Sequence, residues 1–164
     1  MTAPRTTLVR AAVPADAAAL GPLHLRCWAE AYEGLVDPDR LAPYLADVDG
    51  AVRRWTEALA GPSRVWVAED GGALVGFARV QPASGDVVAH LGAVYVRRSH
   101  WSTGVGQRLL DAALGDGPAT LRVFRDNARA RRFYDRNGFV PDGYEAEEPH
   151  LGGVEIGMVR PAPR

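Results

Sequence analysis

The sequence of 164 residues contains no lysine, one cysteine and no long apolar segment. Without lysine, the Gly-Lys-Ser/Thr sequence of a Walker nucleotide-binding loop cannot occur. A single cysteine, Cys27, excludes an intrachain disulfide, and we expect it to pack inside a helix, because free cysteine behaves as a small apolar residue. No stretch approaches the ~20 apolar residues of a membrane span, and no basic leader precedes an apolar run, so the sequence predicts a cytoplasmic protein.

The sequence also has no excess of positive or of negative charge. Nineteen arginines face twenty acidic residues, which gives a formal net charge of −1 and a pI near 6.4. Nucleic acids and anionic membranes require a broad positive field, so neither is expected as a partner. The four histidines occur at no recognised metal-ligand spacing, so no metal is expected. With 47% hydrophobic residues, the chain can bury a core as one domain over residues 1–164.

The spacing of apolar residues predicts strands and helices that alternate along the chain. The predicted strands cover residues 7–12, 64–69, 73–80, 86–96 and 119–125, with two further pieces between 139 and 160, and the predicted helices cover 15–32, 40–60, 104–114 and 126–137. The turn Asp70-Gly71-Gly72 is a strong signal for an antiparallel hairpin. Interruptions of the second helical stretch are expected at Pro43 and Gly50. The order predicts an α/β (α+β) domain.

The turn between the strand over 86–96 and the next helix has the composition of an anion site. The first N–H groups of a helix have no internal acceptor and lie at the positive end of its dipole, so they favour a phosphate. Gly104 and Gly106 would let that phosphate approach the backbone, although two glycines at a helix start serve close packing equally well. A dinucleotide-binding fingerprint is excluded, because Leu109 stands where a third small residue is required.

Trp101-Ser102-Thr103-Gly104-Val105-Gly106 resembles the acetyl-CoA loop of the GCN5-related N-acetyltransferase (GNAT) superfamily, which has the form R/Q-x-x-G-x-G/A after the fourth strand. The segment RVFRDNARARRFYDRNGF (122–139) is similar to the block that completes the cofactor site in that family. The resemblance covers nearly the whole chain. It implies the GNAT fold, a twisted mixed sheet of seven strands that splays between strands four and five and carries helices on both faces. Trp101 departs from the usual Arg or Gln, and Ser102 from a frequent glycine.

The resemblance implies an enzyme that transfers the acetyl group of acetyl-CoA to a primary amine of a small molecule or peptide, by direct attack in a ternary complex. A non-catalytic acyl-CoA-binding module that senses or scaffolds is the alternative, because His90 stands where many relatives have a glutamate. RNA binding through the arginines of 122–136 is disfavoured, since no aromatic-interleaved sheet motif accompanies them. Homodimers are common in the family, so a homodimer is an open option.

Two motifs supply the residues that the resemblance assigns to acetyl-CoA, with the pantetheine arm on the fourth strand and the pyrophosphate on the loop. These residues are Val94, Tyr95, Val96, Trp101, Ser102, Thr103, Gly104, Val105, Gly106, Gln107, Asn127 and Tyr134. Asn127 is equally suited to cap the helix that follows it. Arg129 and Arg132 are the candidates for the ribose phosphate, while the neighbouring arginines are expected on a solvated face.

Tyr134 and His90 are the candidate catalytic residues. The resemblance implies that the Tyr134 phenol protonates the departing thiolate, and an aromatic core position is the alternative. For a lysine-like amine of pKa ~10.4, deprotonation at pH 7 costs roughly 4.6 kcal/mol, and His90 can accept that proton or merely pack on the sheet. Glu69, Asp86 and Glu155 are lesser candidates for the base.

Trp28 and Tyr32, four residues apart on the first helix, are the candidate substrate-binding residues. The resemblance places this helix along the acceptor cleft, where aromatic rings would suit an apolar or cationic acceptor; core packing is the alternative. The acidic stretch 145–148 would attract a cationic amine or form a solvated loop. The identity of the acceptor does not follow from the fold.

Overall fold

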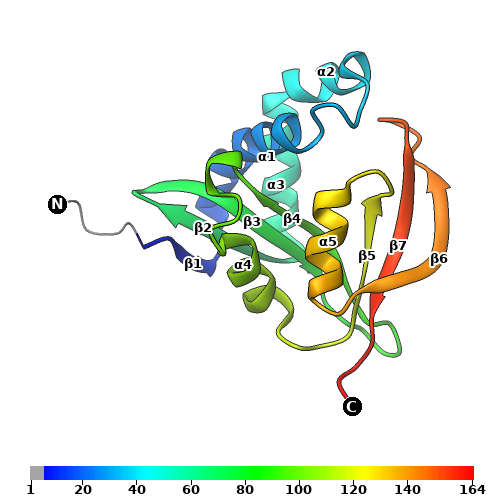
Figure 1. Ribbon diagram of the computed structural model, residues 1–164. Helices are drawn as coiled ribbons and strands as arrows, with labels where there is room; N and C mark the ends of the chain where they lie inside the picture. The colour runs from blue at the N-terminus through cyan, green and yellow to red at the C-terminus, as the bar shows by residue number, and fades with distance from the viewer. Residues whose placement is uncertain (1–5) are drawn as a thin grey trace.

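Residues 6–164 are described by a computed structural model, in which seven strands form one mixed sheet of order β1-β2-β3-β4-β5-β7-β6 (Figure 1). The strands are β1 (Leu8–Ala11), β2 (Arg64–Asp70), β3 (Ala73–Gln81), β4 (Ala89–Val96), β5 (Ala119–Phe124), β6 (Val140–Glu147) and β7 (Val154–Arg160). The helices are α1 (Ala17–Ala31), α2 (Pro38–Ala46), α3 (Val48–Ala60), α4 (Val105–Leu114) and α5 (Ala128–Arg136), with the short 3₁₀ helices η1 (Pro14–Asp16) and η2 (Arg98–His100).

The hairpin between β2 and β3 forms as predicted, with Gly71 and Gly72 both at positive φ in its turn. The predicted interruptions at Pro43 and Gly50 are wrong, because Pro43 lies inside α2 and Gly50 inside α3. The break falls at Asp47, whose carboxylate accepts a hydrogen bond from the Gly50 N–H at 2.9 Å. A Cβ at Gly50 would lie 1.9 Å from that carboxylate, so this glycine makes room for the helix cap.

Helices cover both faces of the sheet (Figure 1). On one face, α1 and α3 pack on β2 and β3 through a cluster that includes Cys27, Trp55 and Phe77. Burial raises the pKa of the Cys27 thiol to about 12, so Cys27 is a packing residue, as predicted. On the other face, α4 buries Leu109 against β2 and β3.

Strands β4 and β5 run parallel but pair only from Ala89 to Leu91. Arg79 of β3 pairs with Ala93 and Val80 pairs with Leu91, so Gly92 is an extra residue that forms a β-bulge in β4. Beyond Leu91, the edge of β4 that faces β5 has no strand partner, and its backbone polar groups require another one. These features confirm the predicted mixed sheet, splayed between its fourth and fifth strands.

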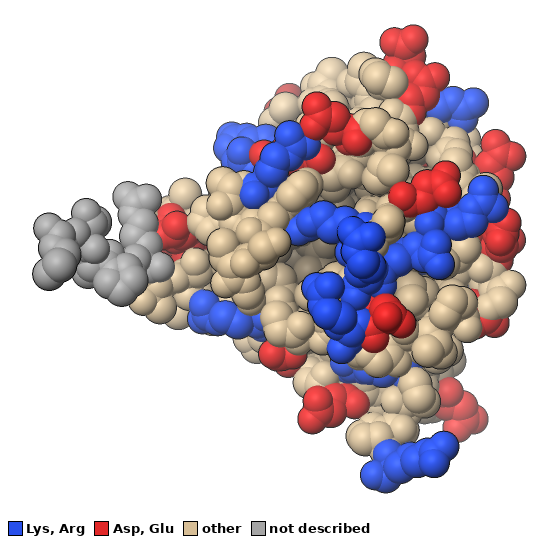
Figure 2. All heavy atoms as spheres, in the orientation of Figure 1, with Lys and Arg blue, Asp and Glu red and all other residues tan. Residues whose placement is uncertain are grey.

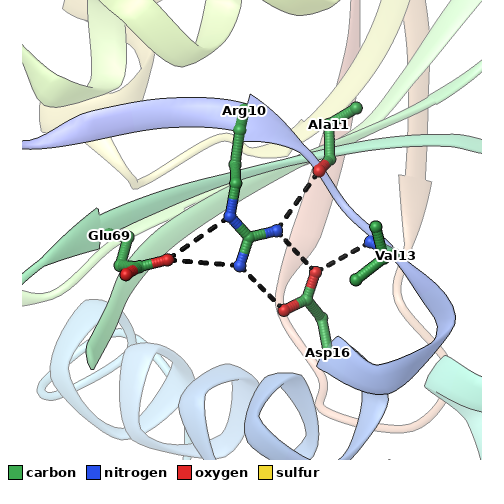
Figure 3. A network of polar contacts seen from close by, with 5 residues as sticks. All are labelled: Arg10, Ala11, Val13, Asp16 and Glu69. Atoms are coloured by element: carbon green, nitrogen blue, oxygen red, sulfur yellow. Dashed lines mark hydrogen bonds and ion pairs between the residues drawn. The ribbon is translucent and has the colours of Figure 1, made fainter. Parts of the chain in front are cut away.

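A network of polar contacts joins β1, η1 and β2 at the edge of the sheet (Figure 3). The Arg10 guanidinium contacts the Asp16 carboxylate at 2.8 Å and the Glu69 carboxylate at 3.2 Å, while Asp16 also accepts the Val13 N–H at 2.8 Å. The hydrogen bond from Arg10 holds the pKa of Asp16 below its ordinary value, although burial opposes this shift. Glu69 therefore has a structural contact at this edge, and it lines neither of the two cavities that contain His90.

We expect Asp16→Asn to lower the free energy of unfolding at pH 7 by about 1–2 kcal/mol, because the Arg10 contacts lose their charge. The folded pKa of Asp16 lies below its unfolded value, so this contribution is complete above about pH 3.9 and is lost as pH falls through the folded pKa. Urea unfolding at neutral and acidic pH measures both effects. The exposed Asp86→Asn is the matched control, and an equal loss in both variants would contradict the role of the network.

Candidate active site

A cavity of about 470 Å³ opens at the end of β4, between the N-terminus of α4 and the length of α5. Its lining contains three guanidinium groups and no carboxylate, and consists of Val94, Val96, His100, Trp101, Ser102, Gly104, Gly106, Gln107, Arg129, Ala130, Arg132, Phe133, Tyr134 and Arg136. Figure 2 shows arginine side chains gathered over α5 beside a hollow. The cavity therefore has the charge of an anion site.

Backbone donors add to this positive charge at the start of α4. Gly104 caps the helix at φ +87°, a conformation that favours glycine. The first bond of the helical ladder runs from the Arg108 N–H to the Gly104 carbonyl at 3.1 Å, so the N–H groups of residues 105–107 precede it. Such N–H groups bind phosphate oxygens, and Gly104 and Gly106 both line the cavity. The residues present therefore fit a pyrophosphate.

The two departures from the family loop each have a structural explanation. Ser102 has φ +60°, a left-handed conformation that L side chains rarely adopt, which explains why glycine is frequent at this position. Trp101 donates its Nε1–H to the Val96 carbonyl at 2.8 Å, and the Arg129 guanidinium lies 3.8 Å from its ring centroid. Trp101 thus holds the loop against the end of β4 and positions one arginine of the cavity.

Several predicted cofactor residues have side-chain contacts of their own. Thr103 donates its hydroxyl to the His100 carbonyl, and Val105 is buried at 3% exposure in the core beneath α4, so neither side chain lines the cavity. The Gln107 amide donates to Asp111 at 2.8 Å and to Asn137 at 2.7 Å. Asn127 accepts the Ala130 N–H at 3.1 Å and therefore caps α5, the alternative that the sequence left open. Thr103 and Val105 can contribute only backbone groups to this cavity.

A second cavity of about 290 Å³ follows the gap between β4 and β5, and we call it the reaction cavity. It is lined by Trp28, Ala31, Tyr32, His90, Leu91, Gly92, Ala93, Val94, Tyr95, Val96, Trp101, Arg122, Val123, Phe124, Asn127, Arg129, Ala130, Tyr134, Glu148, Leu151 and Glu155. Val94, Val96 and Tyr134 line both this cavity and the anion site, so the two adjoin. The structure thus brings both candidate catalytic residues and both candidate substrate-binding residues around one space.

The Tyr134 phenol is buried at 8% exposure and belongs to a core cluster as well as to the reaction cavity. Burial raises its pKa well above the ordinary value, and the nearby Tyr95 contributes in the same direction. Tyr134 therefore stays protonated at neutral pH and keeps a proton that it can donate. The hydroxyls of Tyr32 and Tyr95, which line the same cavity, are hydrogen-bonded to each other.

His90 lies where the pairing of β4 and β5 ends. Its Nδ1 is 2.9 Å from the hydroxyl of Thr120, its cross-strand neighbour on β5. Burial and the charge of Arg122 lower the pKa of His90, so its imidazole is neutral at pH 7 and able to accept a proton. Glu155 also lines the reaction cavity, whereas Asp86 is exposed in the turn before β4 and lines neither cavity, so its candidacy as the base is wrong.

A third cavity, of about 280 Å³, contains residues that the sequence patterns did not single out for the site. We call it the inner cavity; its lining is His24, Trp28, Ala51, Arg54, Trp55, Arg79, Gln81, His90, Gly92, Ala93 and Tyr95. The four-residue spacing of His24 and Trp28 on α1 was the available signal, since it places both side chains on one helix face. Trp55 and Arg79 join them only through packing between distant segments.

Two structural observations bear on metals and membranes. Over residues 6–164, no group of three or more potential ligand side chains is arranged to hold a metal ion. No helix in that part of the chain is long and apolar enough to cross a membrane.

The structure thus defines a class of fold: a mixed sheet that splays between two parallel strands, with a positively charged cavity at its open end. The model of the acetyltransferase (GNAT) domain matches residues 61–141. A probable N-acetyltransferase of Mycobacterium tuberculosis is 29% identical over 167 residues, which cover 93% of this chain and 91% of that protein. N-alpha-acetyltransferase 40 of Saccharomyces cerevisiae is 42% identical over 65 residues, or 32% of this chain and 23% of that protein.

Solved structures share the fold over nearly the whole length. The PaiA N-acetyltransferase from Thermoplasma acidophilum, in complex with coenzyme A, has a TM-score of 0.74 at 16% identity and covers 95% of this chain and 99% of its own. YncA of Salmonella typhimurium, with acetyl-CoA, has a TM-score of 0.69 at 19% identity, and the match covers 97% of this chain and 95% of YncA. The family model and the curated relatives agree with the GCN5-related N-acetyltransferase superfamily that the sequence motifs predicted.

We expect Ser102→Gly to leave the protein as stable as before, or more stable by up to about 1 kcal/mol, because glycine relieves the left-handed strain. The matched control, Ser99→Gly in η2, should lower stability by about 0.5–1 kcal/mol. Thermal unfolding measures both changes. A loss of stability in Ser102→Gly as large as in the control would show that the Ser102 conformation is not strained.

Proposed function

We propose that this N-acetyltransferase moves the acetyl group of acetyl-CoA to a primary amine of a small molecule or peptide, by direct attack in a ternary complex. The observation that supports the proposal is the gap between β4 and β5. At one end lies the anion cavity, whose lining has arginines and no carboxylate, and at the other lies His90 with a neutral imidazole. The phosphates, the pantetheine arm and the thioester of acetyl-CoA would then each lie beside residues of suitable chemistry.

The anion cavity would hold the phosphates of acetyl-CoA. The N–H groups at the start of α4 and the guanidinium groups of Arg132 and Arg136 supply the donors and the positive charge. Arg129 stacks on Trp101, and its pKa is lowered by desolvation and by Arg136, so a phosphate beside it would compensate an unfavourable clustering of charge. Unpaired backbone groups of residues 92–96 would bind the amides of the pantetheine arm.

Acetyl-CoA supplies the thioester, and the protein's part of the chemistry is to position it and to move two protons. The unpaired β4 N–H groups would stabilise the negative charge that develops on the carbonyl oxygen. Tyr134 donates its phenolic proton to the sulfur as the C–S bond breaks and the C–N bond forms. The raised pKa of Tyr134 keeps this proton available throughout the neutral range.

His90 would take the proton that the attacking amine loses. If Nδ1–H donates to the Thr120 hydroxyl, the Nε2 lone pair is free to accept a proton inside the reaction cavity. The bulge at Gly92 supports this assignment, because it turns His90 toward the cavity face that Tyr95 also lines.

Four further expectations stay predictions: a small-molecule or peptide acceptor, one domain over residues 1–164, a cytoplasmic location and a homodimer. Residues 1–5 lie outside the described part of the chain.

The experiment that tests the proposed function is calorimetric titration with coenzyme A and with acetyl-CoA, followed by thiol release against a panel of amines. Binding with amine-dependent thiol release supports it. Binding of coenzyme A without thiol release in the presence of any amine would favour the alternative, a sensing or scaffolding module, and absence of binding would reject the cofactor site.

In the same assays, Tyr134→Phe should lower kcat by about 10²- to 10⁴-fold and leave the coenzyme A Kd within about twofold. An unchanged kcat would remove Tyr134 as the acid.

We expect His90→Gln to lower kcat/KM at about pH 6.5 by roughly 10²-fold, with a deficit that shrinks toward about pH 9.5. The reason is that the fraction of free amine grows with pH, so a base becomes less necessary. Thr120→Val, which removes only the hydrogen-bond partner of His90 Nδ1, should lower kcat/KM by a smaller factor. A deficit in His90→Gln that is the same at every pH would mean that His90 only packs on the sheet.

A further inference from the structure

The inner cavity lies between α1, α3 and the strands β3 and β4, on the face of the sheet opposite α4. It shares five residues with the reaction cavity: Trp28, His90, Gly92, Ala93 and Tyr95. The two spaces are therefore contiguous, and His90 stands at their junction. An acceptor whose amine reaches His90 would extend its other end into the inner cavity.

The lining of the inner cavity has two guanidinium groups, Arg54 and Arg79, and no carboxylate. Arg54 is largely exposed and pairs with Asp47 at 3.3 Å. Arg79 is half-buried and donates its Nε–H to the Ser63 hydroxyl at 3.1 Å, and it forms no ion pair with any carboxylate of residues 6–164. A half-buried guanidinium without a counter-ion retains donors and charge for a ligand.

The neutral groups around Arg79 leave its charge without compensation. His24 accepts the Trp55 Nε1–H at its Nδ1 at 3.2 Å, and burial together with the charges of Arg54 and Arg79 lowers its pKa to about 4. The Trp28 Nε1–H is buried and makes no hydrogen bond of good geometry among the described residues, although the Tyr95 hydroxyl lies near it. A buried donor without a partner is uncommon in folded proteins and indicates a place for a ligand oxygen or a water.

The reaction cavity, unlike the inner cavity, contains carboxylates as well as guanidinium groups. Glu148 and Glu155 line it, and burial, reinforced by Glu148, raises the pKa of Glu155. Arg122 also lies there, but it pairs with Asp142 at 3.6 Å and stacks on Tyr144. The two contiguous cavities thus contain the carboxylates of Glu148 and Glu155 in one and the guanidinium of Arg79, which has no ion pair among the described residues, in the other, with His90 in the lining of both.

We propose that the acceptor is a primary amine that also carries a carboxylate, joined by an apolar or aromatic body, and that its carboxylate pairs with Arg79 in the inner cavity. The tryptophan rings of residues 28 and 55 form the walls for the apolar body. The proposal rests on the proposed function and specifies its acceptor. A polyamine is disfavoured, because its second ammonium would face two guanidinium groups and no carboxylate.

The test measures acceptor binding separately from turnover. Trp28 and Trp55 line the inner cavity, so tryptophan fluorescence of the coenzyme A-bound protein reports its occupation without a reaction. The probes are L-phenylalanine, L-leucine and 5-aminopentanoate, each compared with its carboxamide, which keeps the amine and the body but removes the negative charge. At least one acid should bind about tenfold or more tightly than its carboxamide.

Arg79→Gln should weaken binding of that acid by about ten- to a hundredfold and leave the Kd of the carboxamide within about twofold. The matched control is Arg53→Gln, an exposed arginine of α3 outside the cavity lining, which should change neither Kd. Unchanged thermal unfolding of Arg79→Gln would exclude a folding defect as the cause. Equal affinity for acids and carboxamides, absence of binding by every acid, or the same loss for both ligands in Arg79→Gln would each overturn the proposal.

Thiol release with the same pairs separates this proposal from the proposed function. If carboxamides and acids are acetylated with equal kcat/KM, the protein is an N-acetyltransferase and the carboxylate preference is wrong. If acids bind through Arg79 but no amine releases thiol, the acceptor site is supported and catalysis is rejected.

Discussion

Three residues of strand pairing, from Ala89 to Leu91, hold β4 against β5, and the rest of the site depends on the pairing ending there. A parallel pair that continued would satisfy the backbone of residues 92–96 and close the sheet. Because it stops, a row of polar backbone groups faces a cavity inside the molecule, where a ligand can take the place of a strand. The bulge at Gly92 falls next to this point and turns the side chains on either side of it.

Charge is distributed around this gap in separate regions. Arginines and the N-terminus of α4 make one end favourable for phosphates, and the lining of the reaction cavity includes two carboxylates. Within the cleft, burial keeps His90 neutral and Tyr134 protonated. A net charge of −1 gives no indication of this arrangement, because it sums regions that bind opposite charges.

The family loop tolerates substitution because its function depends mainly on backbone N–H groups. Trp101 replaces a polar side chain, yet its indole holds the loop to Val96 and stacks on Arg129. Ser102 occupies a left-handed position and keeps the turn at the expense of strain. Both residues change the contacts around the anion site and leave the geometry of the turn in place.

Short-range signals in the sequence determined the elements, the hairpin turn at Gly71-Gly72, the cap at Asn127 and the anion-binding turn at Gly104, because each depends on residues within a few positions of one another. They misplaced the break between α2 and α3, where a side-chain cap at Asp47 outweighed the proline and glycine signals. Only the tertiary structure decided that β4 and β5 separate and that Arg79 meets His24 and Trp55 in one cavity. Such contacts join segments far apart in the chain, and their geometry follows from packing that no local pattern encodes.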